Sequence, residues 1–162
     1  ICSNVDEFYP SVLNLLNIDK KSELHVAGRL DADTTGLVLI TDDGRWSFNI
    51  IRPSRHCEKV YRVGLSRSIA DSTEDNVAEK FEKGIQLQGE STVTLPATLE
   101  VIHPKEVLLT LREGKFHQVK RMFSAVGNKV VSLHRERIGK LSLDVDVGEW
   151  RYLTAEEVRS FD

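Results

Sequence analysis

The 162-residue sequence has few of the residues that staple small folds together or anchor proteins in membranes. It contains two cysteines, Cys2 and Cys57, and neither belongs to a Cys-x-x-Cys pair or lies near histidines at zinc-finger spacing. Its apolar runs are of strand length, far short of the roughly 20 residues that a membrane span needs. These shortages exclude disulfide-rich, zinc-finger and membrane-spanning classes. We expect a cytoplasmic protein with reduced thiols and no membrane partner.

The net charge is also small, because 22 basic side chains face 25 acidic ones, which gives −3. On its own, such a total argues against a nucleic-acid partner. The distribution says otherwise. Residues 101–140 carry nine basic and three acidic side chains, net +6, whereas residues 68–100 carry two and seven, net −5. Segregated charge steers a charged ligand toward one face, so the basic segment is a candidate surface for a polyanion.

Apolar periodicity and turn residues predict interspersed strands and helices. The expected helices cover residues 10–18, 45–51, 71–83 and 115–126, and a capping box at Thr154 and Glu157 predicts a last short one. The expected strands cover residues 37–41, 59–65, 98–103, 107–112, 129–133, 138–143 and 150–153. Because the two kinds of element do not alternate regularly, the predicted fold class is α+β.

The segment from Gly28 to Gly36 concentrates polar residues just before a predicted strand. Its Asp31-x-Asp33-x-Thr35 spacing imitates the start of a calcium-binding EF-hand loop, but the later ligand positions do not follow. The same spacing resembles the nucleophile motif of haloacid-dehalogenase-type phosphatases. Two other interpretations stay open: Asp31 as a metal-independent nucleophile supported by a nearby cation, and a loop whose side chains only bond its own backbone.

Three motifs in order resemble those of one enzyme family. They are Gly28-Arg29-Leu30-Asp31-x-x-Thr34-x-Gly36-Leu37, then Glu58-Lys59-Val60-Tyr61-Arg62-Val63, then Glu113-Gly114-Lys115-Phe116-His117-Gln118-Val119-Lys120-Arg121-Met122-Phe123. The combination is similar to pseudouridine synthases of the RsuA/RluB/RluE/RluF type. The resemblance implies a mixed, mainly antiparallel sheet with packed helices. It also implies isomerisation of a specific uridine in ribosomal RNA, without cofactor or metal.

The resemblance further implies a role for each matching residue. Asp31 matches the catalytic aspartate, and Tyr61 matches the tyrosine that lies against the target base and helps to move its C5 proton. Lys120 matches the basic position that pairs with the aspartate. A flipped-out uridine needs such an aromatic support. The residues expected to contact substrate or RNA are Arg29, Leu30, Thr35, Arg52, Arg55, His56, Lys59, Lys115, His117, Gln118, Arg121, Arg135 and Arg137.

Members of this family usually carry an S4-type RNA-binding domain and an apolar strand ahead of the point where this chain begins. We therefore expect residues 1–162 to be the catalytic domain without that front part. The expected partner is 16S rRNA within a small-subunit assembly intermediate, and the expected state is a monomer. Two alternatives remain: the same chemistry on a 23S rRNA uridine, and a non-catalytic RNA-binding module.

Overall fold

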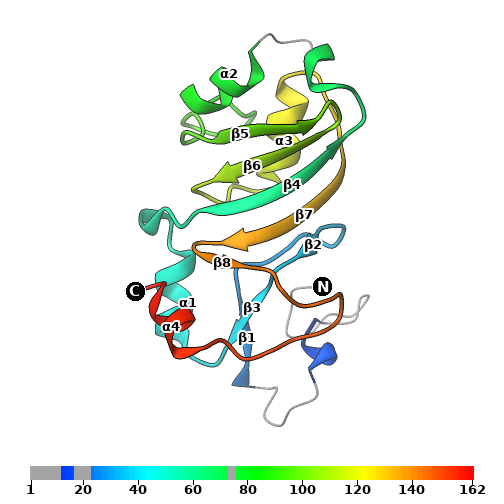
Figure 1. Ribbon diagram of the computed structural model, residues 1–162. Helices are drawn as coiled ribbons and strands as arrows, with labels where there is room; N and C mark the ends of the chain where they lie inside the picture. The colour runs from blue at the N-terminus through cyan, green and yellow to red at the C-terminus, as the bar shows by residue number, and fades with distance from the viewer. Residues whose placement is uncertain (1–11, 17–22, 73–75) are drawn as a thin grey trace.

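The computed structural model describes residues 12–16, 23–72 and 76–162. Its larger sheet has six strands, which are β2 (Thr35–Gly36), β4 (Lys59–Leu65), β5 (Thr98–His103), β6 (Glu106–Leu111), β7 (Val130–Ile138) and β8 (Leu141–Ser142). They follow the order β2-β7-β4-β6-β5, and β8 pairs with β7 (Figure 1). Every pairing in this sheet is antiparallel except that of β2 with β7. The predicted α+β class with a mixed, mainly antiparallel sheet is confirmed.

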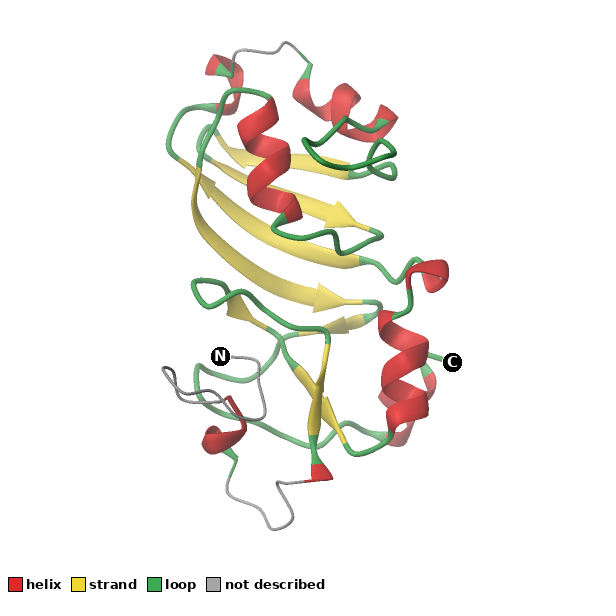
Figure 2. Cartoon of the chain, turned by 180° about the vertical axis from the view of Figure 1, so that it is seen from behind, coloured by secondary structure: helices red, strands yellow, loops and turns green. Residues whose placement is uncertain are grey.

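Two helices cover one face of this sheet, as Figure 2 shows from behind. They are α2 (Val77–Lys83) and α3 (Gln118–Ala125). Phe81 and Phe123 are fully buried and meet edge to face, with ring centroids 5.2 Å apart. They belong to the same core as Val63 and Leu109 of the sheet. Burying each such side chain contributes about 2 kcal/mol, so this core holds α3 against the strands.

A second core surrounds the smaller sheet, in which β1 (His25–Ala27) and β3 (Leu39–Thr41) pair antiparallel. It lies beside α1 (Gly44–Ile51) and α4 (Ala155–Arg159), at the lower end of the molecule in Figure 1. Trp46 meets Phe161 edge to face at 5.5 Å, and its indole N–H donates to the carbonyl of Val158 at 3.2 Å. Asp43 caps α1 by accepting from two backbone amides, as its position before the helix predicts.

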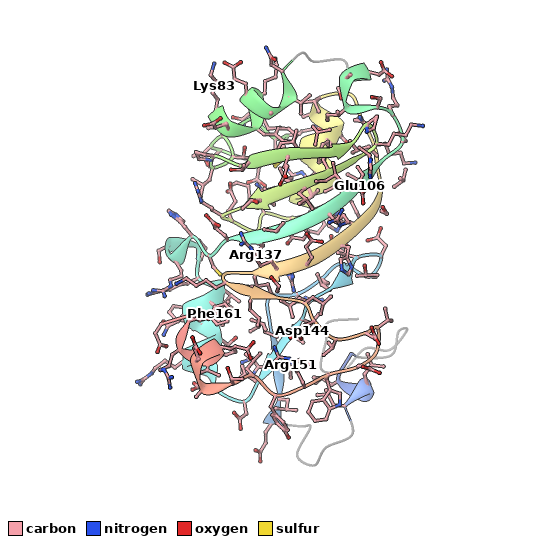
Figure 3. The ribbon with its side chains drawn as sticks, viewed as in Figure 1. Lys83, Glu106, Arg137, Asp144, Arg151 and Phe161 are labelled. Atoms are coloured by element: carbon pink, nitrogen blue, oxygen red, sulfur yellow. The ribbon has the colours of Figure 1, made fainter. Side chains whose placement is uncertain are left out.

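The segment after β8 is held by a side chain. Arg151 donates to the carboxylates of Asp144 and Glu157 over 2.7–2.9 Å, and Figure 3 shows Arg151 and Asp144 together. Bonding to Arg151 lowers the pKa of Glu157 to about 2. Glu157 also completes the predicted capping box with Thr154. The strand predicted over residues 150–153 is wrong, because these described residues form no strand.

The other strand predictions are confirmed or corrected by the sheet. Strand β4 covers the predicted residues 59–65, and β5 and β6 form the predicted hairpin around Pro104-Lys105. Residues 129–143 do not divide at the charged run 134–137 as predicted. That run lies within β7, where Arg135 is buried and Arg137 lies on the open face (Figure 3), with a register shift against β4 between them.

Two of the predicted helices, those over residues 71–83 and 115–126, are shorter than expected. The helix expected over 45–51 is confirmed by α1, but α3 starts at Gln118, because His117 has a left-handed backbone with φ 46°. Helix α2 begins at Val77, and residues 73–75 of the longer prediction lie outside the described residues. The helix expected over 10–18 is described only at 12–16, where Val12–Leu15 forms a 3-10 turn, η1. No helix in the described ranges is long and apolar enough to cross a membrane.

Candidate active site

The loop that carries Asp31 is held at both ends by one side chain. Arg135 of β7 is 1% exposed, and its guanidinium donates to the carbonyl of Gly28 at 2.9 Å and to that of Leu37 at 2.8 and 3.0 Å. A longer contact, at 3.4 Å, reaches the carbonyl of Arg29. A planar guanidinium with several donors suits such a set of carbonyls, and a single ammonium does not. Arg135 therefore fixes the loop that presents Asp31.

A close backbone approach at Gly36 completes this arrangement. Gly36 pairs with Arg135 and has φ 121°, and a Cβ built there would lie 2.1 Å from the carbonyl oxygen of Arg135. The next amide, of Leu37, donates to that same oxygen at 2.7 Å. Beside them, the hydroxyl of Thr35 shares a hydrogen bond of 2.7 Å with Nδ1 of His134. Only glycine permits the β2 backbone to come this close to β7.

The first and third motifs meet at Asp31. Its side chain is 40% exposed, and its Oδ1 lies 3.6 Å from Nε2 of His117. His117 has a left-handed backbone immediately before α3. The turn that precedes α3 is closed by Gln118, whose side-chain oxygen accepts from the backbone N–H of Lys115 at 3.0 Å. The start of α3 thus places an imidazole beside the Asp31 carboxylate.

In this structure Lys120 does not pair with Asp31, its predicted partner. The ammonium of Lys120 lies 2.7 and 2.8 Å from the two carboxylate oxygens of Asp33, two residues beyond Asp31. This hydrogen bond lowers the pKa of Asp33, whose side chain is 68% exposed. The motif thus brings Lys120 to the Asp31 loop, but onto its second carboxylate. Sequence reasoning considered Asp33 only as a ligand or phosphatase residue, because side-chain pairing over 87 positions leaves no local signal.

Tyr61 and Lys59 share one face of β4. Tyr61 is half-buried against the core that includes α3, and it lies opposite Arg135 of β7. Its hydroxyl makes no hydrogen bond within the described chain. Lys59 is two residues away, so the pleat places it on the same face, and its ammonium likewise has no hydrogen-bonding partner among the described residues. Burial lowers the pKa of Lys59, and Arg135 adds to that effect.

Several of the predicted RNA contacts prove to be structural. Arg135 and Gln118 are buried, so both predictions of an RNA contact are wrong. Arg121 donates to Glu90 at 3.1 Å and to two backbone carbonyls, and Lys115 lies 3.7 Å from Glu90 and from Glu113. The role of Glu90 was missed, because only the packing of the 84–97 segment beside α3 reveals it.

A second group of predicted contacts lies around the turn before β4. Arg52 lies over the ring of Phe48 at 5.9 Å, and Arg55 donates to the carbonyl of Phe161 at 2.8 Å. His56 is exposed and ends the turn with φ 51°. In both ribbon views this turn and β2 lie on opposite sides of the molecule (Figures 1 and 2). The structure does not bring this group together with Asp31.

A cavity of about 910 Å³ lies below the Asp31 loop. Asp31 and Thr35 line it, together with apolar residues of β3 and the segment after β8, but Tyr61, His117 and Lys120 do not. Because it reaches one predicted catalytic residue and none of the others, the cavity does not define the site. The candidate site is the surface where the Asp31 loop meets β7 and the start of α3, with Tyr61 on the next strand, β4.

The fold is that of an RNA-modifying isomerase, as the comparison with known families shows. Residues 3–125 match the RNA pseudouridylate synthase family, and the chain belongs to that family. Membership agrees with the rejection of the calcium-binding interpretation and argues against the phosphatase one.

The ribosomal small subunit pseudouridine synthase A of Vibrio cholerae is 57% identical over 99% of this chain and 68% of its own length. The enzyme of that name from Escherichia coli K12 is 56% identical over the same shares. A crystal structure of a pseudouridylate synthase has a TM-score of 0.92 at 47% identity, over 99% of this chain and 68% of its own. A chain of an archaeal box H/ACA ribonucleoprotein complex shares the fold, with a TM-score of 0.53 at 19% identity.

Proposed function

We propose that this protein converts a specific uridine of small-subunit ribosomal RNA to pseudouridine with Asp31 as nucleophile. The observation that carries the proposal is the position of Asp31: half-exposed on a loop that Arg135 holds at both ends, and 3.6 Å from His117 of the third motif. A carboxylate that is fixed in place and open to solvent is what a carboxylate nucleophile requires. The names of the relatives supply the class of substrate.

In this proposal every step belongs to one isomerisation, so no atom is gained or lost overall. The N1–C1′ bond of the uridine breaks, the uracil turns, and C5 bonds to C1′ while its proton leaves and N1 gains one. Asp31 attacks C1′ of the sugar or C6 of the base and departs at the end. Tyr61 lies against the uracil and helps to move the C5 proton. Lys120 turns from Asp33 to Asp31 when RNA is bound and balances the charge there.

The uridine must leave its base stack to reach Asp31, because the carboxylate lies on a protein surface. The proposal places Lys59 beside the bound nucleotide as an unpaired cation. It also assigns residues 1–162 to a catalytic domain that works as a monomer in the cytoplasm, on a small-subunit assembly intermediate, without metal or cofactor.

The test is to map pseudouridines in ribosomal RNA from cells with and without the gene. We expect one position in the small-subunit RNA to be unmodified in the deletion strain and restored by the gene on a plasmid. Loss of a pseudouridine in 23S rRNA instead would support the proposed reaction and contradict the proposed substrate. An unchanged map would contradict both.

A further inference from the structure

We propose that the stacked rings of Phe116 and His117 form a platform for the base of a nucleotide adjacent to the target uridine. The proposal rests on the proposed function, because it concerns how the same RNA is held. It assigns a binding role to Phe116, which the predicted contacts do not include.

Phe116 is exposed to an unusual degree for a large aromatic side chain. It is 74% exposed, whereas Phe81 and Phe123 of the nearby core are fully buried. One side of its ring faces the imidazole of His117, with centroids 3.8 Å apart and planes at 21°. Because His117 covers only one face of the ring and the side chain is still 74% exposed, the other face is open to solvent. Exposed aromatic surface of this kind is the usual support for unstacked RNA bases.

The backbone that carries Phe116 is firmly held. The carbonyl of Phe116 accepts from Arg121 at 2.9 Å, and the same guanidinium is anchored on the carbonyl of Gln88 at 2.6 Å and on Glu90 at 3.1 Å. Stacking on a fixed ring costs little ordering of the protein. These contacts hold the backbone of Phe116 without covering its ring, which suits a preformed support better than a packing residue.

The position of the platform indicates which ligand it takes. His117 lies between Phe116 and Asp31, since its ring stacks on Phe116 and its Nε2 lies 3.6 Å from the Asp31 carboxylate. The open face of Phe116 is therefore about one ring beyond the group that attacks the target uridine. An open aromatic face stacks on a planar base, and it offers a phosphate no hydrogen-bond donor. The geometry fits the base of a neighbouring nucleotide.

The test measures binding and single-turnover rate with short RNAs that contain the mapped uridine. In one RNA the nucleotide on its 5′ side is abasic, in another the nucleotide on its 3′ side. For the unmodified RNA we expect Phe116→Ala to weaken binding about 10-fold, with little change in the rate at saturating RNA, and Phe116→Trp to bind at least as well as wild type. For wild type, one of the two abasic RNAs should bind about 10-fold more weakly than the unmodified RNA. For Phe116→Ala, that abasic RNA and the unmodified RNA should bind equally well.

The control is Val101→Ala, which removes exposed apolar surface on β5, the edge strand at the far side of the sheet from β2. It should bind like wild type, and thermal unfolding checks that each variant folds. The platform would be overturned if the abasic sites lowered the RNA affinity of wild type and of Phe116→Ala by the same factor. It would also be overturned if Phe116→Ala bound the unmodified RNA as tightly as wild type does. Failure of wild type to form pseudouridine would instead count against the proposed function, and the binding comparison would still decide the platform.

Discussion

At the scale of the residue, the question is what Lys120 does when its nearest carboxylate belongs to Asp33. Two roles are possible for an ammonium held at 2.7 and 2.8 Å by Asp33. It can serve only to fix the loop, or it can be a cation that Asp33 stores until Asp31 needs it. The two roles predict different behaviour for the two partners of the pair.

We expect Lys120→Met to lower the single-turnover rate about 100-fold, a loss typical of removing one electrostatic group from an active site, with RNA binding reduced less than threefold. Asp33→Asn should keep the rate within about threefold of wild type, because it frees Lys120 and removes no catalytic group. Quench-flow assays with tritium at C5 measure both rates. If Asp33→Asn loses as much as Lys120→Met, the pair only positions the loop.

The pair also predicts a pH dependence. Because the hydrogen bond from Lys120 lowers the pKa of Asp33, its stabilising contribution is present above the ordinary pKa of Asp33, 3.8, and is lost as pH falls through the lowered value. Any stability difference between wild type and Lys120→Met should therefore shrink at strongly acidic pH.

At the scale of the element, the Asp31 loop depends on β7. Arg135→Met should lower the free energy of unfolding by about 3 kcal/mol or more, because the carbonyls of Gly28 and Leu37 lose a charged donor. Arg135→Lys should recover little of it, since one ammonium cannot serve both ends of the loop. Urea unfolding measures these changes. Arg112→Met, which breaks an exposed pair with Glu58, is the control and should cost less than about 1 kcal/mol. Full rescue by lysine would contradict the role assigned to Arg135.

Much of the element structure could be predicted from the sequence, and the failures have physical causes. Strand β4 and the hairpin of β5 and β6 follow local alternation and turn residues. The continuity of β7 could not be predicted, because its charged residues 134–137 are balanced by partners far along the chain, including the carbonyls of Gly28 and Leu37. The motifs predict Asp31, Tyr61 and Lys120 as site residues, whereas the pairing of Lys120 with Asp33 and the burial of Arg135 depend on tertiary contacts.

At the scale of the whole molecule, the basic segment 101–140 is less positive in space than along the chain. Five of its cations form ion pairs, which are Arg112 and Arg137 with Glu58, Lys115 and Arg121 with Glu90, and Lys120 with Asp33. Glu90 comes from the acidic segment 68–100. Part of the positive charge of the segment 101–140 is therefore neutralised in the fold by acidic side chains from other segments.

This cancellation predicts a mutation that strengthens RNA binding. Glu90→Gln should remove the negative charge that Lys115 and Arg121 share, while Glu113 and two backbone carbonyls still hold these side chains. We expect it to tighten binding severalfold and to steepen the salt dependence, with the slope of log K against log salt more negative by up to about 1.4 if both cations meet phosphates. Glu100→Gln is the control, because Glu100 is exposed on β5 and pairs with no cation in the described chain. Titrations at several salt concentrations measure the slopes. Equal slopes for the two variants would mean that Glu90 does not restrain the RNA surface.

The central claim, that Asp31 performs the chemistry on this RNA surface, is tested most directly by Asp31→Asn in a single-turnover tritium-release assay with RNA binding measured in parallel. Asparagine keeps the size of the side chain and its place on the Arg135-held loop but cannot act as the carboxylate nucleophile. We predict that the variant binds the RNA within about threefold of wild type and releases no tritium above background. Turnover at the wild-type rate would contradict the assignment of Asp31.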